Sequence, residues 1–378
     1  MSMGPGPGRG LRASGVPSRQ GWAEVAPEPQ RVVLISLEPW DDTWRRNQYL
    51  CRELLSSGAA QEIVFVGPAT PSGAPRHSPL AGVSVLEPRR RVPNRLGGAR
   101  LLAASLRSEV RSADVLWVND PYVGALTSGV AARVVYDVTD DWRSYPFPER
   151  VRRRIAGAED VLARKAVTVV CSEALRQRWE ERYGVQAHVV PNGVDVARYA
   201  SAVPKTLDHR RPRVGYVGTL QPERLDIGLV RATARALSTG GTLHLVGPDA
   251  LGDVARAALL AEPNLVLHGP CRADEVPGFM AAMDVLVCPH LVDPFTLSLD
   301  AIKAYEYAAV GRPVVATPTS GFQELRGVPG IIVSEAASFV AEVLTALQPG
   351  AVRPQPLVGS EWKARAEQFA AVLSAPRP

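Results

Sequence analysis

Short apolar runs recur along the first half of the chain, and amphipathic segments with helical spacing separate them. Most of these runs are continuously apolar instead of alternating, which is typical of parallel strands covered on both faces. A repeated strand–helix unit predicts an open, doubly wound sheet. The strands expected in this half are residues 31–37, 62–67, 114–118, 133–138, 166–171 and 187–190.

The pattern stops at residues 196–212, which are polar and irregular, and we expect a linker there. The strand–helix rhythm then resumes, so the chain predicts two Rossmann-like units, each with a sheet of its own. A ligand is expected in the cleft that the carboxyl ends of both sets of strands face. The strands expected in the second unit are residues 213–217, 242–246, 264–268, 285–288, 313–317 and 330–333.

A length of 378 residues also favours two domains, because single cores rarely grow that large. Residues 360–374 have helical spacing, with Ser360 as the expected N-cap. The expected parts are a disordered basic tail at 1–28, an N-terminal domain at 29–195, the linker at 196–212, a C-terminal domain at 213–350 and a C-terminal tail at 351–378.

The chain carries a net charge of +5 and has a sequence pI of about 9.2, which invites an anionic partner. Interleaved aromatic residues and nucleic-acid motifs are missing, so we expect no nucleic acid to bind. The sequence has no apolar run of about 18 residues, and its first residues lack the apolar core of a signal peptide. These features predict a cytoplasmic protein, with at most weak contact to the inner face of a membrane.

The four cysteines have none of the spacings that metal sites use. Most of them end or follow apolar stretches, so we expect buried, reduced thiols and no bound metal. They are Cys51, Cys171, Cys271 and Cys288.

The segment 293–317 carries the most informative chemistry. A loop is expected to open into a helix near Ser298, where free backbone N–H groups and the helix dipole favour a phosphate at residues 296–299. Lys303 and Glu306 lie one turn apart on this helix. They suit a nucleotide, because the cation would bind a phosphate and the carboxylate would accept two ribose hydroxyls. A simple ion pair within the helix is the other interpretation.

Residues 303–317, KAYEYAAVGRPVVAT, resemble the signature of retaining GT-B glycosyltransferases of family four. Those enzymes carry glutamates at the positions of Ser298 and Glu306, so this chain matches only the second. One subgroup, similar to the bacterial teichuronic-acid type, carries a lysine at the position of Lys303. The resemblance implies that Glu306 holds the donor ribose and that Ser298 replaces the usual contact to the donor sugar.

A second matching segment, GYVGTLQPERLD at residues 215–226, follows the first strand of the second unit. The family has a Gly-Arg pair there and a lysine some residues later. Gly218 matches the glycine, Thr219 replaces the arginine, and Arg224 stands for the lysine. A glycine lets the backbone approach a diphosphate, and a guanidinium binds phosphate oxygens in a fork. A solvated surface arginine is the alternative for Arg224.

Loops after the strands of the first unit resemble the acceptor side of the same family. Trp44 and Arg46 lie in a first loop similar to that of the teichuronic-acid type. Acceptor or phosphate contact is expected there, and the packing of aromatic residues at the start of a helix is the alternative. Asp120 is the candidate for orienting the acceptor hydroxyl. Asp140 and Asp141 are candidates for binding acceptor hydroxyls. Helix capping is the alternative for this pair, and a metal-binding pair is typical of single-domain glycosyltransferases instead.

The resemblance implies transfer of a sugar, with retention, from a UDP-, GDP- or dTDP-linked donor to a hydroxyl of a polysaccharide, a lipid-linked acceptor or a secondary metabolite. It implies no cofactor, no metal, a monomer or homodimer, and a closing helix at 360–374 that packs back on the N-terminal domain. The catalytic residues it implies are Asp120, Arg224 and Lys303, and the donor-binding residues are Gly218, Thr219, Arg224, Thr296, Leu297, Ser298, Lys303 and Glu306.

Three other functions fit part of the pattern. A nucleotide-sugar 2-epimerase shares this fold, but it needs acid and base side chains around the sugar, and the sequence shows no clear set. A catalytically impaired partner subunit would explain the departures at Ser298 and Thr219. An NAD-dependent dehydrogenase is suggested only by the repeated units, and no G-x-G-x-x-G follows any expected strand.

Overall fold

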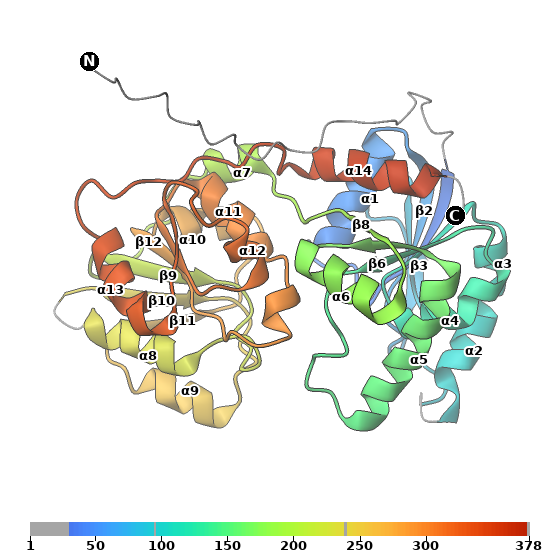
Figure 1. Cartoon of the computed structure of the whole chain (residues 1–378), viewed down its shortest axis with the longest axis horizontal. Coiled ribbons are helices and arrows are strands. Elements are labelled where there is room, and N and C mark those ends of the chain that lie inside the picture. Colours follow the sequence, from blue (N-terminus) through green and yellow to red (C-terminus); the bar gives the residue numbers. More distant parts are fainter. Residues whose placement is uncertain (1–29, 94–95, 238–239, 376–378) are drawn as a thin grey trace, which may run out of the picture.

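The computed structural model describes residues 30–93, 96–237 and 240–375, so the tail expected at 1–28 lies outside the described residues. Two lobes lie side by side, each with a mainly parallel sheet at its centre and helices on both faces (Figure 1). The prediction of two Rossmann-like, doubly wound units is confirmed.

The first lobe is built on an eight-stranded sheet. Its strands are β1 (Gln30–Ile35), β2 (Ala60–Val66), β3 (Ala74–His77), β4 (Val83–Glu87), β5 (Val115–Val118), β6 (Val134–Val138), β7 (Val167–Val170) and β8 (Ala187–Val189). They lie in the order β3-β4-β2-β1-β5-β6-β7-β8, with β3 antiparallel to β4. The sequence analysis missed β3 and β4, since both are short and polar side chains interrupt their apolar positions. Its helices are α1 (Arg46–Ser56), α2 (Gly98–Ser105), α3 (Arg107–Arg111), α4 (Pro121–Thr127), α5 (Glu149–Lys165) and α6 (Glu173–Tyr183).

The second lobe has a six-stranded sheet whose paired strands are all parallel. Its strands are β9 (Arg213–Val217), β10 (Thr242–Val246), β11 (Leu265–Gly269), β12 (Val285–Cys288), β13 (Val314–Ala316) and β14 (Ile331–Val333). They lie in the order β11-β10-β9-β12-β13-β14. Its helices are α8 (Ile227–Ala236), α9 (Asp253–Leu260), α10 (Val276–Ala281), α11 (Ile302–Val310), α12 (Ser320–Gln323) and α13 (Ala336–Ala346).

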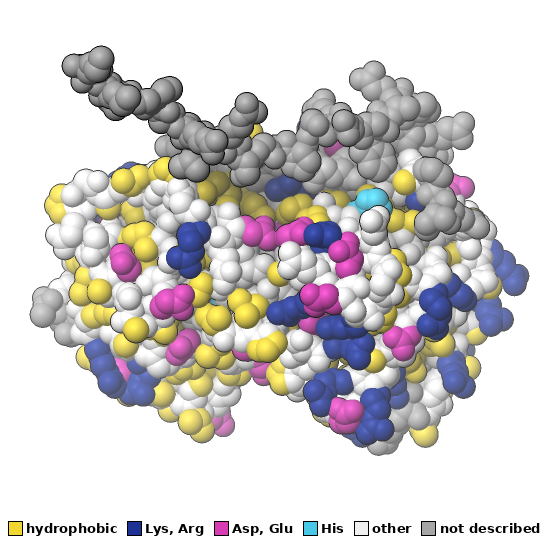
Figure 2. Space-filling model, in the orientation of Figure 1, with side chains coloured by type: hydrophobic (Ala, Val, Ile, Leu, Met, Phe, Trp, Pro, Cys, Tyr) yellow, Lys and Arg dark blue, Asp and Glu magenta, His cyan; other side chains and the backbone are white. Residues whose placement is uncertain are grey.

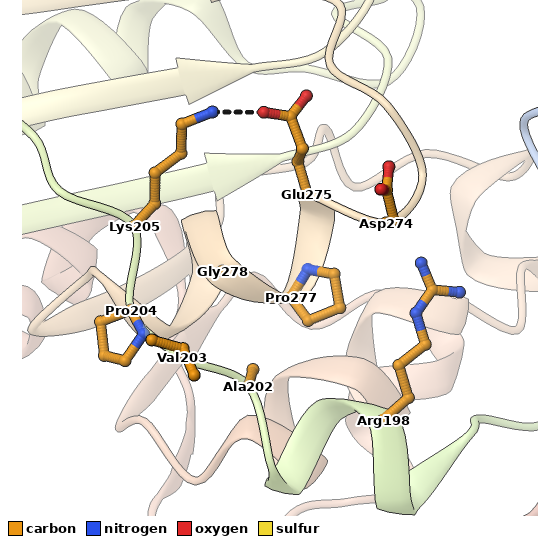
Figure 3. A pocket seen from close by; sticks show the side chains of 9 residues that line it. All are labelled: Arg198, Ala202, Val203, Pro204, Lys205, Asp274, Glu275, Pro277 and Gly278. Carbon is orange, nitrogen blue, oxygen red and sulfur yellow. Dashed lines mark hydrogen bonds and ion pairs between the residues drawn. The ribbon is translucent and has the colours of Figure 1, made fainter.

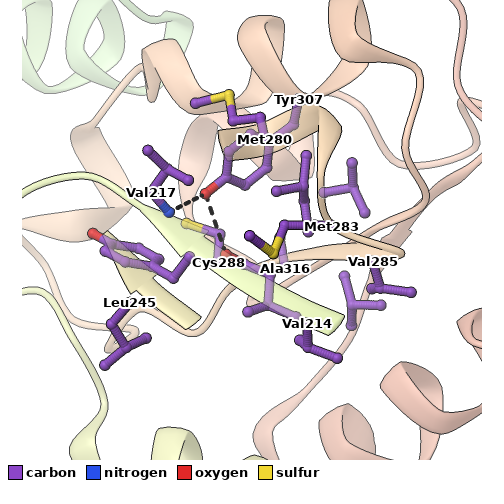
Figure 4. Packing of buried hydrophobic residues seen from close by; sticks show 14 of the residues in the cluster. Val214, Val217, Leu245, Met280, Met283, Val285, Cys288, Tyr307 and Ala316 are labelled. Atoms are coloured by element: carbon purple, nitrogen blue, oxygen red, sulfur yellow. Dashed lines mark hydrogen bonds between the residues drawn. The ribbon is translucent and has the colours of Figure 1, made fainter. Parts of the chain in front are cut away.

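One buried tyrosine fixes α11 on the sheet of the second lobe. Tyr307 is fully buried, and its hydroxyl accepts a hydrogen bond from the backbone N–H of Val217 at 3.0 Å (Figure 4). The same hydroxyl reaches the carbonyl of Val287 at 3.5 Å. Met280, Met283 and other apolar side chains pack around it (Figure 4). Because the helix is fastened to the ends of β9 and β12, the side chains one turn before Tyr307 lie at the carboxyl end of the sheet.

The segment between the lobes is more regular than its polar composition suggested. Residues Val196–Ala200 form a short helix, α7, so the expectation of an irregular linker from 196 onward was wrong there. The side chain of Asp195 caps this helix by accepting a hydrogen bond from the backbone N–H of Arg198 at 3.2 Å. Tyr199 is buried in the core of the second lobe, which stabilises the single turn.

The last helix, α14 (Trp362–Ser374), returns from the second lobe and packs against α1 of the first (Figure 1). Phe369 is fully buried, with its ring centroid 4.7 Å from that of Trp117. Trp362 stacks on Tyr49 at 4.9 Å. The helix begins at Trp362, and the hydroxyl of Ser360 donates to the carbonyl of Leu357, so the expectation of Ser360 as N-cap was wrong. The C-terminal helix is therefore part of the core of the first lobe.

None of the helices in the described ranges is long and apolar enough to cross a membrane.

We predict that Phe369→Ala lowers the free energy of unfolding of the first lobe by about 3–5 kcal/mol, because it leaves a cavity beside Trp117. Urea denaturation followed by tryptophan fluorescence measures the change. Val358→Ala is the control, since Val358 is fully exposed and should change stability by less than about 0.5 kcal/mol. An equal effect of both substitutions would contradict the assignment of α14 to the core.

Candidate active site between the lobes

A half-buried lysine lies at the carboxyl end of β9. The ammonium of Lys303 is 5.4 Å from the centre of the Tyr216 ring, and the side chain of Lys303 lies directly over Gly218. Burial lowers the pKa of Lys303, although the Glu306 carboxylate and the Cys288 thiol oppose this shift. Within the described residues Lys303 forms no ion pair, so its charge is left for a ligand.

Two glycines make room for this lysine. A Cβ atom on Gly218 would collide with Cε and Nζ of Lys303, and the φ of Gly218 is +149°. Gly247, with φ +142°, follows β10, and a Cβ there would collide with the carbonyl of Gly218. Only glycine fits at both positions, since the turn after β9 is enclosed by Lys303 on one side and by the end of β10 on the other.

Glu306 lies one turn beyond Lys303 and is partly exposed. Its Oε1 accepts a hydrogen bond from the hydroxyl of Tyr199 on α7. Burial raises the pKa of Glu306, whereas the Tyr199 hydroxyl, Lys303 and Arg198 lower it. The structure thus places the carboxylate beside the lysine, as the sequence predicted, but its hydrogen-bond partner is a tyrosine of the linker region.

The sequence analysis missed a histidine in this cluster. His290 follows β12, and its Nε2 lies 3.2 Å from the hydroxyl of Tyr216, which in turn reaches the carbonyl of Thr219 at 3.2 Å. Burial holds the pKa of His290 well below its usual range, and Lys303 and Arg224 add to the shift. The ring is therefore neutral and supports the turn at Gly218 and Thr219. Its place directly after a buried strand could have singled it out in the sequence.

Arg224 reaches across the interface between the lobes. Its Nη2 lies 3.2 Å from Oδ1 of Asp140 in the first lobe, and its guanidinium lies over the Phe295 ring at 5.2 Å. Its Nε is buried and has no hydrogen-bond partner in the part of the chain that the structure describes. Burial raises the pKa of Asp140, and the charge of Arg224 opposes this. Arg224 is therefore not a solvated surface arginine, because Asp140 holds it at the interface between the lobes.

Glu38 is a second carboxylate on this side of the cleft that the sequence analysis missed. It follows β1, and it pairs with Arg45 at 3.4 Å. Burial raises the pKa of Glu38, and Arg45 and Arg224 lower it. The first lobe thus presents two carboxylates, Glu38 and Asp140, toward the cations of the second.

The expected phosphate site at residues 296–299 was wrong. Residues Thr296–Ser298 form a 3₁₀ turn, and the α-helix begins only at Ile302. The backbone N–H groups of this turn donate to Asp293, Phe295 and Thr296, so they are not free for an anion. The hydroxyl of Ser298 donates to the carbonyl of Phe295 at 2.6 Å, and Thr296 is also fully buried, whereas the side chain of Leu297 is partly exposed. Leu299 interrupts the helical conformation, which spacing alone could not reveal.

The same turn is bound to the first lobe. The hydroxyl of Ser172, the N-cap of α6, donates to the carbonyl of Ser298 at 2.7 Å. Asn192 donates through its backbone N–H to a carboxylate oxygen of Asp300, and through its side chain to the Asp300 carbonyl at 2.7 Å. The residues just before α11 therefore link the two lobes, and this explains why the segment is buried.

Two of the acceptor-side candidates prove to be structural. Arg46 is buried and forms a bidentate pair with Asp137 at 3.0 Å, so the expected contact with an acceptor was wrong. Asp141 is buried as well, and its carboxylate accepts from Arg182, Arg178 and Ser144, which leaves no room for an acceptor hydroxyl. In both cases a charged side chain that looked exposed in the sequence is buried and is neutralised by opposite charges within the first lobe.

Two further acceptor-side candidates are Asp120, which caps a helix, and Trp44, which lines a hollow between the lobes. Oδ1 of Asp120 caps α4 by accepting hydrogen bonds from the backbone N–H groups of Tyr122 and Val123. Its role in orienting an acceptor stays a prediction. Trp44 packs edge-on to Tyr49, with ring centroids 5.3 Å apart, and both rings line a hollow between the lobes.

This interlobe hollow has a volume of about 630 Å³. Trp44, Tyr49 and Arg52 line it from the first lobe, and Arg272 and Asp274 line it from the second. Burial raises the pKa of Tyr49, and the Glu306 carboxylate adds to that shift, so the hollow adjoins the cluster around α11. It offers aromatic faces and guanidinium groups next to a carboxylate, a combination that suits a polar, ring-containing ligand.

A second hollow, of about 460 Å³, lies between the linker and α10 (Figure 3). Lys205 and Glu275 pair across its upper side in the view of Figure 3, and Arg198 lies at its opposite rim. Its charged lining consists of Lys205 paired with Glu275, together with Arg198 and Asp274, and we assign it no chemistry. Elsewhere on the surface, Lys and Arg side chains gather on the first lobe, over the region of α5 and α2 (Figure 2).

Two family models match the chain. The one described as Glycosyltransferase Family 4 matches residues 44–198, and the one described as Glycosyl transferases group 1 matches residues 211–349. Together they take in most of both lobes. The chain belongs to the family-four glycosyltransferases, as the signature around Glu306 predicted.

Two curated relatives agree with this family. The chain is 29% identical over 219 residues to the teichuronic acid biosynthesis glycosyltransferase TuaH of Bacillus subtilis, a match that covers 53% of this chain and 55% of that protein. It is 28% identical over 371 residues to the 2-deoxystreptamine glucosyltransferase of Streptomyces kanamyceticus, covering 83% of this chain and 92% of that protein. The chain thus spans about half the length of the first relative and most of the second.

Solved structures share the arrangement of the two lobes. Sucrose-phosphate synthase of Thermosynechococcus elongatus superposes with a TM-score of 0.66 at 16% identity, covering 91% of this chain and 95% of that one. Anabaena HepE in complex with UDP-glucose superposes with a TM-score of 0.63 at 17% identity, with the same two coverages of 91% and 95%. The fold is GT-B, which confirms the predicted fold class.

We predict that Gly218→Ala weakens the binding of pyrophosphate at least about tenfold, because the new methyl group displaces Lys303 from the end of β9. Calorimetric titration of both proteins measures this. Gly157→Ala in α5 is the matched control, since a Cβ at Gly157 meets open space and should leave the affinity unchanged. Equal affinities of the wild type and Gly218→Ala would show that Lys303 does not bind the anion.

Proposed function

We propose that this protein transfers a sugar from a nucleoside diphosphate donor to a hydroxyl acceptor, with retention of the anomeric configuration. One observation carries the proposal: the half-buried ammonium of Lys303, which has no ion-pair partner among the described residues, lies over Gly218, one turn from the carboxylate of Glu306. A cation over a glycine turn suits a diphosphate, and a carboxylate beside it suits a ribose. The family of the chain and the UDP-glucose bound by HepE support a nucleotide sugar as the donor.

In this proposal the second lobe holds the donor and the first lobe presents the acceptor. Lys303 and Arg224 stabilise the negative charge that develops on the departing diphosphate, which is electrostatic catalysis. Arg224 must first exchange Asp140 for a phosphate oxygen, so donor binding frees the Asp140 carboxylate. That carboxylate and Glu38 can then accept hydrogen bonds from acceptor hydroxyls. The acceptor attacks from the leaving-group face, and a phosphate oxygen takes up its proton.

Closure of the two lobes excludes water from the cleft, which protects the donor from hydrolysis.

Several properties stay predictions: metal independence, the absence of a cofactor, a cytoplasmic location, peripheral contact with a membrane and a monomeric or dimeric state. Arginine-rich surface on the first lobe is consistent with contact to an anionic surface (Figure 2). The relative named 2-deoxystreptamine glucosyltransferase favours a small hydroxylated acceptor, and the one named for teichuronic acid favours a polysaccharide.

We predict that one of UDP, GDP, ADP and dTDP binds clearly more tightly than the others, and that Glu306→Ala weakens this binding by about tenfold or more because a charged hydrogen bond to the ribose is lost. Calorimetric titration with each nucleotide measures the affinities. If none of the four binds, a catalytically impaired partner subunit becomes the better explanation. Turnover of the sugar nucleotide without any acceptor, giving an isomer of the donor, would favour the 2-epimerase.

We predict that Lys303→Ala lowers the transfer rate by about a hundredfold or more. Because burial lowers the pKa of Lys303, its charge is lost at a pH below that of an ordinary lysine, so nucleotide affinity of the wild type falls as the pH rises toward 10.5. Lys303→Arg should keep its affinity over this range, since a guanidinium stays protonated. Lys165→Ala, an exposed residue of α5, is the control for both measurements. Full activity of Lys303→Ala would remove this lysine from the mechanism.

A further inference from the structure

The linker region contributes a side chain to the donor site. Tyr199 of α7 is 4% exposed, and its hydroxyl donates a hydrogen bond to Oε1 of Glu306. Burial, with the charge of Glu306 and the hydrogen bond to it, keeps the pKa of Tyr199 well above its usual value, so the phenol retains its proton and acts as the donor. The tyrosine and the glutamate are far apart in the sequence, and only the fold brings them together.

The hydrogen bond from Tyr199 engages Oε1 of Glu306 and leaves Oε2 available for another donor. Among the described residues no side chain or backbone group donates to Oε2 of Glu306. A carboxylate that is held through one oxygen has a fixed plane, and its second oxygen points in one direction only. Tyr199 also lowers the pKa of Glu306 against the effect of burial, which favours the ionised form that accepts hydrogen bonds.

The tyrosine is itself held from several sides. Asp195 caps α7, and the guanidinium of Arg198 lies 6.0 Å from the centre of the Tyr199 ring while it donates to the carbonyl of Ala273. Three residues before the cap, Asn192 binds Asp300 at the start of α11. The stretch from Asn192 to Tyr199 therefore makes hydrogen bonds at two places, to Asp300 just before α11 and to Glu306 within it. These two contacts define the position of the tyrosine relative to the helix.

We propose that Tyr199 is a positioning residue for the donor: it orients the Glu306 carboxylate so that the free oxygen binds the ribose hydroxyls of the nucleoside diphosphate. This inference rests on the proposed function, because it takes Glu306 as the ribose ligand. It adds that α7, in the linker region, contributes to the recognition of the ribose by orienting Glu306. A preorganised acceptor oxygen loses less rotational freedom on binding than a mobile one, and this raises the affinity for the hydroxylated ligand specifically.

The test compares two ligands that differ only in the ribose hydroxyls, UDP and 2′,3′-dideoxy-UDP, or the corresponding pair for the nucleotide that the wild type prefers. Tyr199→Phe keeps the ring and removes the hydroxyl. We expect it to weaken UDP binding about five- to twentyfold and to leave the affinity for the dideoxy analogue unchanged within about twofold. In a Glu306→Ala background, Tyr199→Phe should cause no further loss for either ligand, since the interaction it acts through is gone.

Tyr183→Phe is the matched control. Tyr183 also donates to a glutamate, Oε2 of Glu159 at 2.9 Å, but it does so within the first lobe. Its loss should leave both affinities unchanged. Thermal unfolding of all variants shows whether they are folded, and the preserved binding of the dideoxy analogue gives a second check on the integrity of the site.

The outcomes separate the two proposals. If wild-type protein binds none of the nucleotides, both the proposed function and the role of Tyr199 fail. If the wild type binds UDP but Tyr199→Phe weakens UDP and the dideoxy analogue equally, Tyr199 is only structural and the proposed function stands. The same conclusion follows if Tyr199→Phe has no effect, or if it still weakens UDP binding in the absence of Glu306.

Discussion

The attachment of α11 to the sheet of the second lobe is the constraint on which the candidate site depends. Tyr307 binds the ends of β9 and β12 from this helix, and the apolar core around Met280 and Met283 holds it in place. Lys303 lies one turn before Tyr307 on the same helix and Glu306 lies directly before it, so the positions of both side chains follow from the position of Tyr307. A shift of α11 by a fraction of a turn would separate the lysine from Gly218 and the glutamate from Tyr199.

The electrostatics between the lobes favour the binding of an anion. Among the described residues, Lys303 is a half-buried cation without an ion-pair partner, and Arg224 pairs with a single carboxylate, Asp140 of the opposite lobe. Burying a charge without a partner destabilises a protein, so such an arrangement persists where the rest of the fold over-determines it. An anion that enters between these two cations would remove the penalty at Lys303 and replace the Asp140 contact at Arg224. The direction of both pKa shifts agrees with this, since burial lowers that of Lys303 and raises that of Asp140.

The two lobes are joined by more than a flexible connection. Ser172 and Asn192 bind the residues before α11, Tyr199 binds the helix itself, and α14 returns to complete the core of the first lobe. Relative motion of the lobes must therefore strain or break contacts that lie next to the candidate donor site. Through these contacts, ligand binding at the site can change the angle between the lobes, and the angle can in turn change the affinity of the site.

Sequence alone determined the class of fold, because continuous apolar strands alternating with amphipathic helices have few other solutions. It also singled out Gly218, Arg224, Lys303 and Glu306, whose spacing and residue types are local properties of the chain. It failed where neighbours distant in the sequence decide the outcome. Arg46 and Asp141 looked like cleft residues, but both are buried and charged partners on other elements neutralise them. The turn at Ser298 ends before the helix begins, because the first lobe binds its carbonyl.

Tertiary structure alone revealed Tyr199, His290 and Glu38, which carry no motif of their own. Each lies in a different part of the chain, and its surroundings are set by elements distant in the sequence: His290 lies beside Tyr216 of β9, Tyr199 beside Glu306 of α11, and Glu38 faces Arg224 of the other lobe. A pattern along the chain reports the local conformation and the face that is buried, since these depend on residues a few positions apart. Which hydroxyl meets which carboxylate across the interface depends on contacts between residues a hundred positions apart, and the folded chain decides these by packing.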